Sequence, residues 1–188
     1  MGAATGTAVP RTTPAVVGVF LAGAAVSVLL GVYGRTHDPT GETALTLFFD
    51  EQITMKAWTA TAAALAVLIQ VTSALRLYGK IGSGPAPAWL GPVHRLSGTV
   101  AFILTLPVAY HCLWSLGFDT DVGTTRVFIH SIAGLLFYGA FATKVLVVRR
   151  HDLPGWALPV AGGLVFTGLV LAWLTSAFWF FDTVGLGL

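Results

Sequence analysis

The sequence predicts an all-α, polytopic membrane protein built as a bundle of five transmembrane helices. The first observation is composition: of 188 residues, 55% are hydrophobic and only 10% are charged. A soluble domain carries about 25% charged residues because its surface faces water. The second observation is five apolar stretches, each long enough to cross a hydrocarbon core of ~30 Å. The length leaves no room for a soluble catalytic domain, and the net charge of +2 indicates no nucleic-acid partner.

The first apolar stretch predicts a span over residues 14–33, after a flexible cytoplasmic tail at residues 1–13. A cleaved signal peptide is the competing interpretation, because Arg11 precedes an alanine-rich run. Its apolar region is usually ~7–15 residues long, which is shorter than this stretch. We therefore expect a retained first helix. Residues 14–188 form one transmembrane domain on this interpretation.

The polar residues 34–55 follow, and their LTLFF segment could lie along the membrane surface. The second span is expected at residues 57–77. A Gly/Pro connector, GSGPAPAWLGP, leads to the third span at 96–118, and its Pro92 is well placed to begin a helix. The remaining spans are expected after an acidic turn, GFDTDVGTT, and after LPGW, at residues 127–148 and 156–181.

The basic residues predict the orientation. Five spans put the termini on opposite sides, and one side collects seven of the ten Lys and Arg residues. The other side holds seven of the eight acidic residues. Short loops rich in Lys and Arg stay in the cytoplasm, so we expect the N-terminus inside and the C-terminus outside. A bacterial cytoplasmic membrane is the expected location.

Two histidines on adjacent spans are the main candidates for chemistry. His111 lies near the end of the third span and His130 near the start of the fourth, so their depths differ by roughly 6 Å. An ionisable side chain inside a bilayer is a functional-site hypothesis when a partner can be named. The natural partner here is a b-type haem whose iron both imidazoles ligate.

Neighbouring residues favour this haem hypothesis. Gly134 follows His130 by four residues, on the same helical face, and leaves space for a macrocycle. Arg126 precedes His130 by four residues, nearer to water, where it could neutralise a propionate. Pro107 removes one backbone donor before His111, and a kink there would re-aim that ligand.

Simpler interpretations stay open. Both histidines could be polar links between packed helices, each contributing ~0.6 and up to about 2 kcal/mol. A transition-metal site is less favoured, because no carboxylate or cysteine converges at their depth. The single cysteine, Cys112, points about 100° away from His111 around a helix and is interpreted as a packing residue.

His94 could anchor a second site at the inner face, about 25 Å from His111 along the helix. Its histidine partner on that side, His151, lies beyond two arginines at the water boundary and would be exposed. Alternatively, His94 and Arg95 could bind a quinone head group or a lipid phosphate. His94 could also be only a polar residue at a helix start. Lys144, one turn from the inner end, is expected to snorkel to the headgroups.

The run HRLSGTVAFILTLPVAYHC (94–112) resembles the ligand-bearing helices of bis-histidine b-type cytochrome membrane domains of the ferric-reductase-like kind. HSIAGLLFYGAF (130–141) repeats the spacing of a histidine and a glycine four residues later. The resemblance covers helices three and four only. It implies haem ligation by His111 and His130, and His94 as a ligand of any second haem. Such families often space two ligands on one helix by little more than a dozen residues, whereas His94 and His111 are seventeen apart.

The expected function is electron transfer, from a quinone or partner protein to an external acceptor, as a possible subunit of a membrane oxidoreductase. A non-haem scaffold or accessory subunit of a larger membrane complex is the alternative. It would use small-residue faces such as Gly23, Ala24 and Ala25 for close helix contacts. A transporter ranks last, because there is no internal repeat and no acidic residue lies mid-membrane.

Overall fold

The computed structural model describes residues 12–43, 45–118 and 125–186 of the chain. It is all-α, and five of its helices are long and apolar enough to cross a membrane. The predicted five-helix membrane architecture is confirmed at this level. The acidic turn falls mostly outside the described residues, as does the predicted N-terminal tail. The helices are α1 (Thr12–Thr36), α2 (Gln52–Leu77), α3 (Leu90–Tyr110), α4 (Thr125–Val148), α5 (Ala157–Trp173) and α6 (Trp179–Thr183), with π-helical turns η1 (His111–Ser115) and η2 (Leu174–Phe178).

Two helices begin earlier than the hydropathy indicates. Helix α2 starts at Gln52 rather than residue 57, and α3 at Leu90 rather than residue 96. Hydropathy marks where a span enters apolar surroundings, whereas backbone hydrogen bonding continues into the polar flank. Pro92 fits inside the first turn of α3, because the amide hydrogens of a first turn have no partner within the helix.

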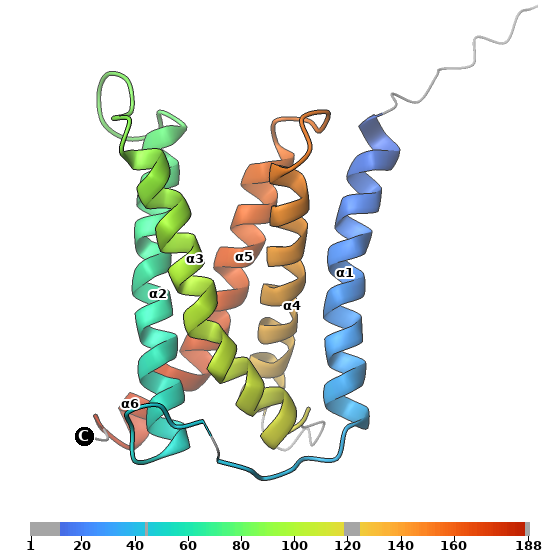
Figure 1. Cartoon of the computed structure of the whole chain (residues 1–188), viewed down its shortest axis with the longest axis vertical. Coiled ribbons are helices and arrows are strands. Elements are labelled where there is room, and N and C mark those ends of the chain that lie inside the picture. The colour runs from blue at the N-terminus through green and yellow to red at the C-terminus, as the bar shows by residue number, and fades with distance from the viewer. Residues whose placement is uncertain (1–11, 44, 119–124, 187–188) are drawn as a thin grey trace, which may run out of the picture.

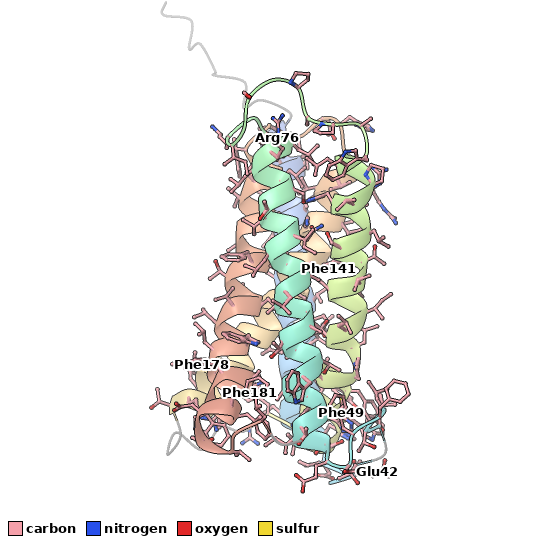
Figure 2. The ribbon with its side chains drawn as sticks, turned by 90° about the vertical axis from the view of Figure 1, so that its left-hand side faces the viewer. Glu42, Phe49, Arg76, Phe141, Phe178 and Phe181 are labelled. Carbon is pink, nitrogen blue, oxygen red and sulfur yellow. The ribbon has the colours of Figure 1, made fainter. Side chains whose placement is uncertain are left out.

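The helices lie roughly parallel, and the bundle has two distinct ends (Figure 1). We call the end where α1 begins the N-terminal end; it also carries the α2–α3 and α4–α5 connectors. The opposite end, the C-terminal end, carries the α1–α2 loop, η1 and α6. In Figure 2, Arg76 marks the N-terminal end, and Phe178 and Phe181 mark the C-terminal end.

Helix α4 is the centre of one half of the bundle. It packs against α1 on one side and α5 on the other, while α2 packs mainly against α3. The two halves meet in an apolar core of α2, α3, α4 and α5. Phe102 and Phe141 stack there with ring centroids 4.0 Å apart, and the Tyr138 hydroxyl donates to the Thr105 carbonyl oxygen at 3.0 Å.

The contact between α1 and α4 is close enough to require glycine. A Cβ built on Gly23 would lie 1.8 Å from Thr143 Oγ1 and 2.5 Å from the Gly139 carbonyl oxygen. A Cβ on Gly139 would lie 2.0 Å from Ser27 Oγ. Small residues let membrane helices approach to backbone contact, where van der Waals packing stabilises the pair. These glycines therefore hold α1 against α4.

Large apolar side chains cover the outside of the bundle. On α1, Leu21 is 63% exposed and Leu29 is 67% exposed. Water would make such a surface unfavourable, whereas lipid chains cover it at little cost. The outward-facing apolar residues therefore agree with a bundle surrounded by a bilayer.

Candidate functional site

His130 is held in one orientation by α5. Its ring Nδ1 lies 3.0 Å from the carbonyl oxygen of Ala172. A carbonyl oxygen only accepts hydrogen bonds, so Nδ1 carries a proton and donates. In the neutral ring, Nε2 is then the nitrogen with the lone pair, and it accepts a hydrogen bond from the Cys112 thiol. It lies 3.9 Å from Cys112 Sγ, across the boundary between α4 and η1.

Two π-helical turns flank His130 at this depth. Turn η1 follows α3, and its wide hydrogen bond runs from the Leu116 amide to the His111 carbonyl at 3.0 Å. Pro107, inside α3, lacks the amide hydrogen that would bond one turn back. Turn η2 follows Ala172 and Trp173 on α5 and contains Thr175, whose Oγ1 lies 3.4 Å from His130 Nδ1. Such turns re-aim side chains and are frequent at functional sites.

A cavity of about 650 Å³ opens beside His130, between α1, η1 and α4. Its size is within the range of small-molecule and cofactor sites, roughly 300–1,000 Å³. A Cβ built on Gly134 would meet nothing within 4 Å, so this glycine leaves open space in the wall. The polar or ionisable side chains in the lining are Arg35, Cys112, His130, Ser131 and Tyr138.

His111 faces a different part of the protein. It is completely buried, and its Nε2 donates to the Leu45 carbonyl oxygen at 2.8 Å. Its Nδ1 accepts a hydrogen bond from the Gln52 side-chain amide, and Ser115 Oγ lies 3.1 Å from the same nitrogen. Both ring nitrogens are therefore engaged by protein groups. His111 links η1 to the α1–α2 loop and to the start of α2.

The same loop makes backbone hydrogen bonds to η1. The Thr40 amide donates to Trp114 O at 3.2 Å, and the Gly41 amide donates to Ser115 O at 3.0 Å. His37, in the α1–α2 loop, packs against the rings of both Tyr33 and Trp114, with ring centroids 5.0 and 4.5 Å away. These contacts fold the loop over the C-terminal end of the bundle, close to the cavity.

The structure therefore brings Gly134 and His130 to one cavity but does not bring His111 into it. Arg126 does not line the cavity either. Its Nη1 donates to the Thr175 carbonyl oxygen at 2.5 Å, and its guanidinium lies 3.9 Å from the ring centroid of Trp179. The arginine in the cavity wall is Arg35, from the end of α1.

His94 lies far from the cavity, near the N-terminal end of α3. Its Nδ1 is 2.8 Å from Ser73 Oγ on α2, and its carbonyl oxygen accepts a hydrogen bond from the Gln70 amide. His151 lies beyond the end of α4 and is exposed. The structure shows no contact between His94 and His151 in the part of the chain that it describes.

Sequence reasoning missed Arg35, Cys112 and Tyr138 as members of this site. Cys112 was interpreted as a packing residue, but its sulfur faces His130. Helical geometry could have predicted the role of Cys112, because successive residues of a helix point about 100° apart. When His111 faces the loop, Cys112 faces a neighbouring helix. Nothing in the sequence pairs Arg35 with His130, because that proximity depends on α1 docking against α4.

The residues around the cavity fit a haem in part. His130 fits as an iron ligand, because a metal-bound histidine usually donates its other ring N–H to a carbonyl or carboxylate. Gly134 provides space, and Arg35 provides a cation for a propionate. His111 would have to release its bonds to Leu45 and Gln52 to reach the same cavity. No group of three or more His, Cys, Asp or Glu side chains that could hold a metal ion occurs among the described residues.

Comparison with known proteins places the chain in one family. A family of unknown function, DUF6529, matches residues 16–188, and the chain belongs to it. No curated protein matches the sequence, and no solved structure matches it.

Proposed function

We propose that this protein is a membrane electron carrier that binds one b-type haem in the cavity beside His130. The observation that carries the proposal is the hydrogen bond from His130 Nδ1 to Ala172 O, at 3.0 Å. It fixes the tautomer whose Nε2 can ligate a metal, beside a cavity large enough for a cofactor. A bound haem iron supplies reversible one-electron transfer, tuned by its ligands and by burial.

The chain's own residues have separate tasks in this proposal. The Ala172 carbonyl orients the imidazole of His130, and Gly134 leaves room for a flat ring. Arg35 lies at the end of α1, where it can hold a carboxylate near the membrane surface. Tyr138 ties α4 to Thr105 of α3 and so keeps the cavity wall in place.

Ligation of the same iron by His111 stays a prediction. It requires η1 to rotate and the α1–α2 loop to release the His111 ring from Leu45 and Gln52. The haem would otherwise have His130 as its one histidine ligand. Cys112, whose Sγ lies 3.9 Å from His130 Nε2, is another side chain of a type that can bind iron.

The site's place in the membrane follows from the proposed orientation. The basic residues at the N-terminal end of the bundle include Arg76, Lys80, Arg95, Lys144, Arg149 and Arg150. From the positive-inside rule we infer that this end faces the cytoplasm of a bacterial cell. The cavity, at the C-terminal end, then lies near the external face. Electrons would come from a quinone or a partner protein, and would leave to an external acceptor.

A difference spectrum tests the proposal. The protein is purified from cells supplied with ample haem, and the oxidised spectrum is subtracted from the dithionite-reduced one. We expect a haem b signal that survives in His94→Ala and disappears in His130→Ala. A colourless protein would instead favour the non-haem scaffold. Loss of the signal in His111→Ala as well would support ligation by both histidines.

A further inference from the structure

A second polar cluster lies at the N-terminal end of the bundle, where α2, α3 and α4 meet. Gln70 is at its centre and is only 8% exposed. Its Nε2 donates to Ser97 Oγ at 2.9 Å and to the His94 carbonyl, and its Oε1 accepts from Lys144 Nζ at 3.2 Å. A Cβ on Gly98 would come within 3.0 Å of the Gln70 amide, so the backbone of α3 leaves room for this side chain.

Lys144 is held in this cluster although it could reach water. It lies one helical turn before Val148, the last residue of α4. A lysine in such a position normally extends its ammonium to the headgroups. Here the ammonium is directed to a buried amide oxygen, and this hydrogen bond uses one of its three N–H donors.

Among the residues that the structure describes, no carboxylate lies within salt-bridge distance of the Lys144 ammonium. Within the described residues the structure has one salt bridge, between Arg150 and Asp152 at 3.2 Å, and Lys144 takes no part in it. A cation in low-dielectric surroundings is unfavourable unless an opposite charge or further hydrogen bonds compensate it. The arrangement therefore favours an anion beside Lys144.

Two other basic residues at this end, Arg76 and Arg150, are engaged with protein groups. Arg76 donates to the carbonyl oxygens of the α2–α3 connector, at 2.8 to 3.0 Å. Arg150 is paired with Asp152. Lys144 therefore differs from both, because its charge is held at the wall of the bundle and stays uncompensated. The anions that a membrane offers beside this end of the bundle are the phosphates of its lipids.

We propose that Lys144, positioned by Gln70 where α2, α3 and α4 meet, binds the phosphate group of an anionic lipid. Gln70 holds the ammonium about one helical turn inside the end of α4, where a lipid phosphate would meet it at the edge of the bundle. The apolar outer faces of the helices would then lie against the acyl chains. The site does not depend on haem or on the outer cavity. Its loss would leave the spectrum of a bound haem unchanged, so the two proposals fail separately.

Native mass spectrometry of the detergent-purified protein tests this site, with phosphatidylglycerol and phosphatidylcholine as the lipid probes. We expect preferential retention of phosphatidylglycerol, and roughly fivefold weaker retention in Lys144→Gln. Lys144→Arg keeps the charge and should keep most of the retention. Excess inorganic phosphate should not displace the lipid, because a free anion lacks the acyl chains.

Arg149→Gln is the matched control, because Arg149 is an exposed cation just beyond the end of the same helix. It should retain the lipid as the unchanged protein does. Equal retention by Lys144→Gln would overturn the proposal, as would an equal loss in Arg149→Gln. Displacement by inorganic phosphate would show a free-anion site and would overturn the lipid assignment. Thermal unfolding of each variant confirms that the helices remain folded, and Lys144→Met repeats the test if Lys144→Gln is not recovered.

Discussion

The ring Nε2 of His130 lies 3.9 Å from Cys112 Sγ, although His111 is the neighbour of Cys112 in the chain. The cysteine faces α4, and the histidine beside it faces the α1–α2 loop. Of these two neighbours in η1, Cys112 therefore lines the cavity and His111 does not. The pairing of Cys112 with His130 also separates the roles of the two histidines: His130 is part of a candidate ligand site, and His111 is a buried link between segments.

Filling the cavity at Gly134 should prevent ligand binding without unfolding the protein. A Cβ at Gly134 meets nothing within 4 Å, so Gly134→Leu places its side chain in open space. We expect haem content to fall strongly while the melting temperature in detergent stays nearly unchanged.

Gly162→Leu, on α5, is the matched control for this change. Its Cβ also meets nothing within 4 Å, and Gly162 does not line the cavity. The control should keep full haem content. Unchanged haem content in Gly134→Leu would exclude this cavity as the site.

Substitution of the two arginines near His130 should affect haem affinity differently. Arg35 lines the cavity, whereas Arg126 is engaged with Trp179 and the Thr175 carbonyl. Arg35→Gln should weaken haem binding several-fold at low salt, since a partly exposed ion pair contributes ~0.2–1 kcal/mol. Haem titrations of both variants at two salt concentrations measure this. A larger loss in Arg126→Gln than in Arg35→Gln would favour the propionate partner expected from helical spacing alone.

The glycine contact between α1 and α4 should not tolerate a methyl group. Gly23→Ala puts a Cβ 1.8 Å from Thr143 Oγ1 and 2.5 Å from a backbone oxygen, and overpacking of this kind costs about 1–3 kcal/mol. We expect a lower free energy of unfolding in detergent.

Gly18→Ala on the same helix provides the comparison, because a Cβ there meets nothing within 4 Å. It should be neutral or slightly stabilising, since alanine is the better helix former. Similar stabilities of the two variants would show that α1 does not dock on α4 as described.

Removal of the His111 ring should loosen the α1–α2 loop. His111→Ala removes the hydrogen bonds that the ring makes to the Gln52 amide and the Leu45 carbonyl, and a typical hydrogen bond contributes about 0.5–1.5 kcal/mol. We expect faster amide hydrogen exchange at Thr40 and Gly41, whose amides bond to η1. Unchanged exchange at both amides would contradict the linking role of His111.

The five helices could be predicted because length and hydropathy are local properties of the chain. The approximate depths of His111 and His130 also followed from their places near the ends of adjacent spans. The direction of each ring could not be predicted. It depends on the wide turn after Pro107, and on a loop that returns Leu45 and Gln52 to the end of α3.

The choice of arginine shows the same limit. The four-residue spacing of Arg126 and His130 predicts that both lie on one face of a helix. It cannot reveal that Trp179 of α6 lies against the Arg126 guanidinium. Arg35 reaches the cavity because α1 packs on α4, and chain order does not specify that neighbour. The glycines that allow this contact, Gly23 and Gly139, become recognisable as a pair only in the folded bundle.

The most direct measurement of the central claim is a titration of haemin into purified haem-free protein, comparing the unchanged chain with His130→Ala. Loss of groups that only orient a metal ligand already weakens metal binding 10–100-fold, roughly, so loss of the ligand itself should cost at least as much. We expect stoichiometric binding of one haem by the unchanged protein, and an apparent Kd at least about 100-fold higher for His130→Ala. Equal affinities for the two proteins, or no binding by either, would contradict the account.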